Sequence, residues 1–267
     1  MDRWRQQSCM PGCMPGWMRC GMRRVAAVGL CVALCASVAH AGTKGIPKHG
    51  PAEVLFDGKD LSGFDTFLPS SGLNADPQHV FTVEHGMVHV SGTEMGYFIT
   101  KKSYENYYLR AEFKWGEGTF APRAGQARDS GILYNVAGPN KVWPRSVEFQ
   151  INEGSTGDFW MTDGAALTGR DGVRVTGPAG SAKKIDRFHK GPWKNVVGYR
   201  DPVNELEKPH GQWNVVELVN RDGHVWQYVN GKLANEGTDA FPASGRILFQ
   251  SEGAEVYFRN IRLYPLR

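Results

Sequence analysis

Residues 213–231 read WNVVELVNRDGHVWQYVNG, and they indicate the fold class most directly. It contains two runs rich in β-branched and aromatic residues, Trp213–Asn220 and His224–Val229, with Asp222-Gly223 between them and Asn230-Gly231 after them. Asn-Gly suits a two-residue type I′ turn because both residues tolerate positive φ, and Asp-Gly is a similar hairpin signal. The stretch therefore predicts consecutive antiparallel strands.

The same pattern continues outward in both directions, and His85-Gly86 marks a third hairpin. Further runs of strand composition are Glu53–Phe56, His79–Glu84, Met87–Ser91, Tyr97–Thr100, Tyr107–Trp115, Ser130–Val136, Ser146–Asn152, Trp193–Tyr199, Arg246–Ser251 and Glu255–Tyr264. No helical period of useful length alternates with them, which argues against a parallel α/β sheet. We expect an all-β fold, a single-domain antiparallel β-sandwich of jelly-roll, concanavalin A-like type. The less regular segment Thr162–Lys194 is expected to form long loops or a lid-like excursion.

The N-terminus has the order of a secretory signal: Arg23-Arg24, an apolar run over Val25–Val38, and then Ala39-His40-Ala41. We expect a signal peptide over residues 1–41, a flexible lead-in over 42–52 and the folded domain over 53–266. All five cysteines precede Ala41, so the exported domain would have neither disulfides nor thiolate metal sites. The expected location is periplasmic or secreted.

The charge balance changes once this leader is set aside. Removing its five arginines and one aspartate from the chain's 31 Lys+Arg and 27 Asp+Glu leaves 26 of each. A neutral domain gives no reason to expect nucleic acid or an anionic membrane as a partner. No later apolar run is long enough to span a membrane, so membrane insertion is not expected. The oligomeric state is not determined by these features.

Strand alternation separates candidate site residues from core residues. In Ser146–Asn152, the side chains of Glu148 and Gln150 point away from the apolar positions, and Gln250 and Glu112 have the same relation to their own strands. Such a row is either a solvated sheet face or a site, and paired carboxylates and amides favour the binding of sugar hydroxyls. Trp143 and Trp160 flank the Glu148 run and could stack on sugar rings, although tryptophans are usually core residues. Motifs for zinc proteases, serine hydrolases, nucleotide-binding loops and dinucleotide folds are absent from the sequence.

Several short motifs resemble one known family in their order and number. They are FDGKDLSGF (56–64), YYLRAEF (107–113), DSGI (129–132), WPRSVEFQ (143–150), GDFW (157–160), EKP (207–209), WN (213–214), VNG (229–231), LFQSEGAEV (248–256) and FRNI (258–261). Together they make the chain similar to the 3-keto-disaccharide hydrolase domain family from about Glu53 to Leu266. The resemblance implies a concanavalin-like or jelly-roll sandwich, and an exported enzyme that cleaves glycosides already oxidised to a ketone at C3.

The resemblance also implies roles for particular residues. A 3-ketone acidifies the C2 proton, so a carboxylate base can remove it, and the enolate can expel the glycosidic oxygen before water adds back. Glu148 is our candidate base, and Gln150 our candidate for binding a hydroxyl or the enolate. Supporting substrate-binding candidates are Asp129, Arg145, Trp143, Trp160, Glu207, Gln250 and Glu112. No cofactor is required and no metal-ligand spacing is present, although a divalent metal is compatible with the chemistry.

Two other functions fit the same residues. One is a carbohydrate-binding module that holds glycan with Trp143, Trp160 and Glu148 without chemistry. The other is a conventional two-carboxylate glycosidase that uses Glu112 and Glu148 across a cleft. In each case the partner is a small-molecule glycoside.

Overall fold

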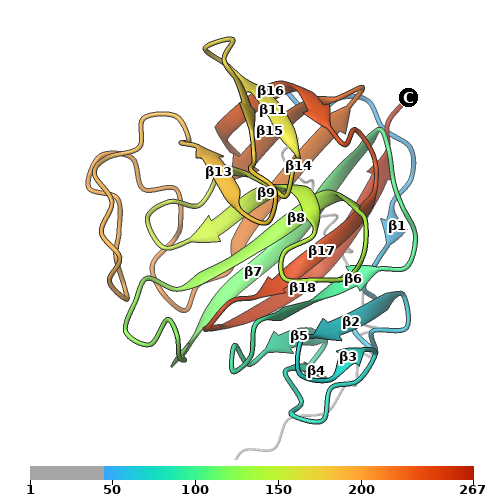
Figure 1. Ribbon diagram of the computed structural model, residues 1–267, viewed down its shortest axis with the longest axis vertical. Helices are drawn as coiled ribbons and strands as arrows, with labels where there is room; N and C mark the ends of the chain where they lie inside the picture. The colour runs from blue at the N-terminus through green and yellow to red at the C-terminus, as the bar shows by residue number, and fades with distance from the viewer. Residues whose placement is uncertain (1–44) are drawn as a thin grey trace, which may run out of the picture. The chain divides into compact units, whose positions relative to one another are not determined.

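Two antiparallel sheets face each other in the computed structural model, which describes residues 45–267 (Figure 1). The strands are β1 (Glu53–Val54), β2 (Phe64–Leu68), β3 (Gly72–Leu73), β4 (Phe81–Glu84), β5 (Met87–Val90), β6 (Gly96–Thr100), β7 (Tyr107–Thr119), β8 (Asp129–Ala137), β9 (Arg145–Asn152), β10 (Phe159–Thr162), β11 (Ala166–Gly169), β12 (Arg174–Thr176), β13 (Ala182–Ile185), β14 (Asn214–Arg221), β15 (His224–Val229), β16 (Lys232–Phe241), β17 (Arg246–Ser251) and β18 (Ala254–Pro265). The described residues contain no helix, and thus none that could cross a membrane. The expected signal peptide lies outside them.

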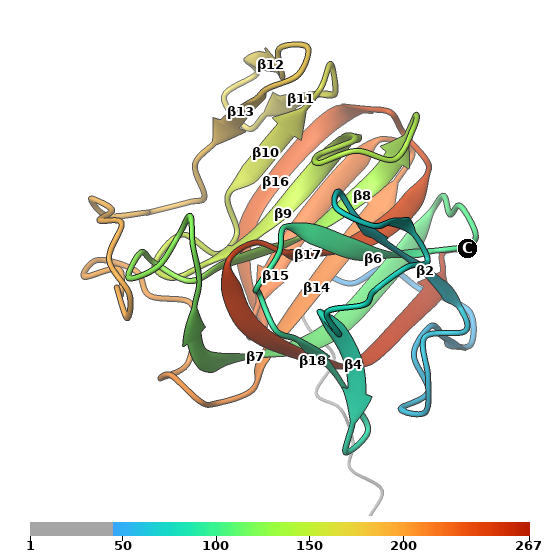
Figure 2. The ribbon, with the colours of Figure 1, turned by 60° about the horizontal axis from the view of Figure 1, so that its bottom comes forward.

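The two sheets differ in size and strand order. The ten-stranded sheet has the order β12-β11-β16-β15-β14-β7-β18-β5-β4, with β1 paired to β18. The eight-stranded sheet has the order β13-β10-β9-β8-β17-β6-β2-β3. Figure 2 shows β8, β9 and β17 of the smaller sheet in front of β14, β15 and β16 of the larger one. This architecture confirms the predicted all-β jelly-roll sandwich.

The core lies between the sheets and is rich in aromatic side chains. Phe98 of β6 stacks on Phe249 of β17 with ring centroids 4.8 Å apart, and Phe258 of β18 meets Phe249 edge-on at 5.3 Å. All three rings are fully buried. Each contributes about 1.5–3 kcal/mol by burial, so contacts of this kind hold the two sheets together.

The three predicted hairpin turns are confirmed. Asn230, Asp222 and His85 have φ values of 49°, 50° and 49°, and the glycine that follows each one also has positive φ. These turns connect β15 to β16, β14 to β15, and β4 to β5.

One strand expectation was wrong, and one loop expectation was incomplete. Residues 193–199 form a loop, because the Trp193 indole donates to the Glu153 carbonyl and Val196 and Val197 remain half exposed instead of joining a ladder. Within Thr162–Lys194, the chain forms β11, β12 and β13 in addition to loops; β11 pairs with β16 and β13 with β10. The strand β11 was missed because its partner β16 is distant in the sequence.

Candidate active site

The outer face of the smaller sheet carries the predicted polar row. Val147, Phe149 and Ile151 of β9 enter the core, so Glu148 and Gln150 point to the other side of the sheet. The Gln250 side chain, from β17, approaches the same surface. Exposure is only 5% for Glu148, 7% for Gln150 and 0% for Gln250. These polar side chains therefore lie in a sheltered site and not on an ordinary solvated face.

Gly131 of β8 lies between Glu148 and Gln250. A Cβ atom at residue 131 would lie 2.3 Å from Glu148 Oε1 and 2.3 Å from Gln250 Oε1. Both distances are far below van der Waals contact, so only glycine leaves room for the two side chains at this position. The DSGI motif thus supplies a gap in the middle of a strand.

A second group of charged side chains continues this surface toward the end of the strands. The Gln150 Nε2 donates to Asp129 Oδ1 at 2.7 Å. The Arg123 guanidinium pairs with Asp129 and lies 3.7 Å from Glu252 Oε1. Arg123 and Glu252 were not among the predicted site residues; Glu252 lies in the LFQSEGAEV motif, and Arg123 lies in a loop with no periodic signal.

The three carboxyl groups in this cluster are unusually weak acids. Burial raises the pKa of Glu148 well above its ordinary value, and the neighbouring Glu252 and Asp129 raise it further. Burial and the Glu252 charge likewise raise the pKa of Asp129, and burial raises that of Glu252 to about 7. Arg123 is the only cation among residues 45–267 that pairs with these carboxyls, and their mutual repulsion favours the protonated forms. The cluster can therefore act both as proton acceptor and as proton donor.

A pocket of about 230 Å³ opens beside this cluster. Its lining residues are Arg123, Asp129, Gln150, Asn152, Ser155, Asp158, Trp160, Lys184, Lys190, Trp193 and Asn195. Trp160 pairs with Glu148 across β10 and β9, and it projects to the same side of the sheet because Phe159 and Met161 enter the core. Trp193 lines the pocket from a loop and is 38% exposed. Aromatic faces next to amides and charged groups are suited to a polar ring with apolar faces.

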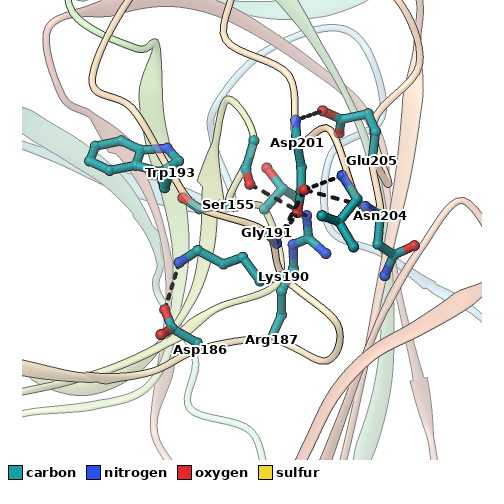
Figure 3. A network of polar contacts seen from close by, with 12 residues as sticks. Ser155, Asp186, Arg187, Lys190, Gly191, Trp193, Asp201, Asn204 and Glu205 are labelled. Atoms are coloured by element: carbon teal, nitrogen blue, oxygen red, sulfur yellow. Dashed lines mark hydrogen bonds and ion pairs between the residues drawn. The ribbon is translucent and has the colours of Figure 1, made fainter.

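The segment that carries Trp193 is held by a buried polar network, drawn in Figure 3. Arg187 pairs with Asp201 at 2.5 Å, and the two side chains are each only 1% exposed. The Asp201 carboxylate also accepts from the backbone N–H groups of Gly191, Val203 and Asn204. Although burial opposes ionisation, these N–H groups hold the pKa of Asp201 below its ordinary value. The network fixes a loop that has no sheet partner, and with it one wall of the pocket.

Four predicted site residues lie elsewhere. Glu112 of β7 points out of the larger sheet, where its carboxylate accepts from Arg110 at 3.0 Å and Arg259 at 2.8 Å. Because Ala111 and Phe113 beside it enter the core, the whole core separates Glu112 from Glu148. The hypothesis of a glycosidase that uses Glu112 and Glu148 across one cleft is therefore wrong.

Glu207 is buried, and its carboxyl accepts from the Trp115 indole at 2.9 Å and from the Thr156 hydroxyl. Arg145 is exposed and donates to the Asp163 carbonyl. Trp143 is on the outer face of the smaller sheet, but it packs on an apolar cluster that includes Leu133. None of these residues lines the pocket.

The described part of the chain contains no group of three His, Cys, Asp or Glu side chains with the spacing of a metal site.

Comparison with known proteins gives a family and a fold. The model of the 3-keto-alpha-glucoside-1,2-lyase-like domain family matches residues 51–264. A crystal structure of a candidate glycosyl hydrolase from Parabacteroides distasonis is 21% identical, with a TM-score of 0.52, and the match covers 81% of this chain and 94% of that one. A structure reported with endo-acting O-glycanases of the human gut microbiota is 14% identical, with a TM-score of 0.52 and coverage of 82% and 100%. At these identities the solved structures show the fold alone.

Comparison with curated proteins gives no match. The family match spans nearly all the described residues, including the strands that carry Glu148, Gln150 and Gln250. The chain belongs to the 3-keto-alpha-glucoside-1,2-lyase-like domain family.

Proposed function

We propose that this protein cleaves the glycosidic bond of 3-keto-glycosides, with Glu148 as the base that removes the C2 proton. The observation that carries the proposal is the position of Glu148: a nearly buried carboxyl, on the outer face of the sheet, next to two further carboxyls with raised pKa. A carboxylate becomes a stronger base as its pKa rises, and burial beside like charges raises the pKa of Glu148.

The proposed reaction has three steps. Glu148 takes the proton from C2, and the electron pair of the C–H bond forms the enolate with the C3 carbonyl. The enolate then expels the C1 oxygen substituent, which takes a proton from a neighbouring carboxylic acid, and a C1=C2 double bond conjugated with the ketone remains. Water adds to C1 and returns a proton to C2, so the net reaction is hydrolysis.

The residues around Glu148 have matching tasks in this scheme. Glu252, with a pKa of about 7, is the candidate proton donor to the leaving oxygen. Arg123 and Gln150 line the pocket with N–H groups that can hold an enolate or hydroxyl oxygen. Trp160 and Trp193 provide aromatic surface for the sugar ring.

The test compares a 3-keto-glucoside with its unoxidised parent. We expect the purified protein to release the aglycone from the first and not from the second, and Glu148→Gln to lose at least about 100-fold in rate, the low end for a general base. Glu112→Gln is the matched control, because it neutralises a carboxylate on the far side of the sandwich. Repeating the assay after a chelator treatment tests the need for a divalent metal.

Release from neither substrate, or equal rates for Glu148→Gln and wild type, would contradict the proposal. A carbohydrate-binding module would instead retain sugar affinity without product. A conventional glycosidase would cleave the unoxidised parent.

We also propose that the protein acts outside the cytoplasm, as supported by the leader-like residues 1–41 and the absence of cysteine from 42–267. Mass spectrometry of the protein from the extracytoplasmic fraction should give a mature N-terminus at Gly42. A chain that retains residues 1–41 would contradict this.

A further inference from the structure

The side-chain amide of Gln250 is buried and faces the candidate base. The residue is 0% exposed, and Glu148 is 5% exposed. Across the gap at Gly131, both Gln250 Oε1 and Glu148 Oε1 lie 2.3 Å from the place where a Cβ would be. Two oxygens that each lie 2.3 Å from one point are at most twice that distance apart, so the two side chains are neighbours across the gap.

The polar atoms of the Gln250 amide are unpaired. Among residues 45–267, neither its Nε2 nor its Oε1 makes a hydrogen bond, and neither does Glu148 Oε1. By contrast, Gln150 Nε2 donates to Asp129. An unpaired buried amide costs about 1–3 kcal/mol, so a fully buried glutamine without a hydrogen-bond partner needs a functional reason.

We infer that Gln250 is a positioning residue that holds Glu148 in both of its protonation states, through the gap that Gly131 leaves. A side-chain amide carries a donor and an acceptor, and rotation about the Cγ–Cδ bond exchanges them. The Nε2 group donates to the carboxylate before the C2 proton is removed. After the proton has moved from C2 to Glu148, the new carboxylic acid donates to Oε1. The inference rests on the proposed role of Glu148 as the base.

Other charges near Glu148 must be separated from this effect. The groups that face it are Asp129 on β8, Glu252 after β17 and Arg123 in the loop before β8. A change at Gln250 leaves all three in place. The contact with Gln250 also favours the ionised form of Glu148, in opposition to burial.

The test is a direct titration of Glu148, which needs no substrate. Carboxyl ¹³C NMR of the full protein, with the Glu148 signal assigned by its loss in Glu148→Gln, gives its pKa in wild type and in Gln250→Met. Hydrogen bonds to a charged group are stronger than those to a neutral one, so loss of the amide should raise the pKa by about one unit. Gly131→Ala, which forces the two side chains apart, should shift it in the same direction.

Gln227→Met is the matched control, because Gln227 is equally buried but reaches the Glu148 backbone carbonyl from the inner side of the sheet. It should leave the Glu148 titration unchanged. If Gln250→Met does not fold, Gln250→Asn, which withdraws the amide by one methylene, takes its place with the same expected shift. An unchanged Glu148 pKa in the folded Gln250 variant overturns the inference.

The acid limb of the pH–rate profile for the 3-keto-glucoside should move by the same amount, with kcat reduced more than KM changes. A wild-type protein inactive on this substrate would contradict the proposed function, whereas the NMR titration would still decide whether Gln250 controls Glu148.

Discussion

Arg187 and Asp201 form an ion pair at 2.5 Å between side chains that are each 1% exposed. The pair joins the two ends of a loop that has no strand partner, and the loop carries Trp193 into the pocket. Backbone N–H groups satisfy the remaining oxygen positions of Asp201. The buried ion pair thus positions Trp193, which is partly exposed.

Removal of one partner from this pair should be costly. Arg187→Leu leaves a buried carboxylate without its cation, so we expect a loss of about 3–5 kcal/mol in the free energy of unfolding, measured by urea denaturation. Lys59→Met, which breaks the exposed pair with Asp57, should cost no more than about 1 kcal/mol. Similar losses in the two variants would show that the buried pair does not hold the loop.

Trp193 should contribute to sugar binding and little to stability. We expect Trp193→Ala to raise KM for a 3-keto-disaccharide about tenfold with a small change in kcat. The substitution removes aromatic surface that contributes about 1.4 kcal/mol of binding free energy, away from the reacting bonds. Trp226→Ala, whose indole stacks on His224 in the larger sheet, is the control and should keep the wild-type KM. An unchanged KM in Trp193→Ala would remove this residue from the binding site.

Glu207 should make stability depend on pH. Burial raises the pKa of Glu207 from 4.5 to about 7. Between these values the unfolded chain is ionised there while the folded protein is protonated, so folding stability should fall as pH rises from about 4.5 to about 7. Glu207→Gln should flatten this part of the curve by roughly 3 kcal/mol at most, as measured by urea denaturation at several pH values. Parallel curves for variant and wild type would contradict this assignment.

Two glycines with the same backbone conformation should tolerate alanine differently. Gly92 and Gly86 have φ values of 79° and 75°. A Cβ at Gly92 would lie 2.4 Å from the Ala254 carbonyl carbon, whereas nothing lies within 4 Å of one at Gly86. We expect Gly86→Ala to cost about 1 kcal/mol from backbone strain alone, and Gly92→Ala to cost more than about 3 kcal/mol. Thermal unfolding of the pair checks this, and equal melting temperatures would show that β5 and β18 can separate locally at no cost.

The period-two alternation and the turn dipeptides determined much of this protein without any tertiary information. They predicted the all-β sandwich, its three hairpin turns, and the outward direction of Glu148, Gln150 and Gln250, because alternation within a strand is a local property of the backbone. The family resemblance could be identified at the same stage, because it depends only on the order of short motifs.

Only the tertiary structure decided which outward faces meet. Glu112 and Glu148 occupy equivalent positions in their strands, yet they lie on opposite sides of the core, because sheet membership is set by pairing between distant strands. The same distant pairing put Gly131 between Glu148 and Gln250, and brought Arg123 to Asp129 from an irregular loop. Alternation gives each strand two faces, but only the packing of whole sheets determines which of these faces becomes a site.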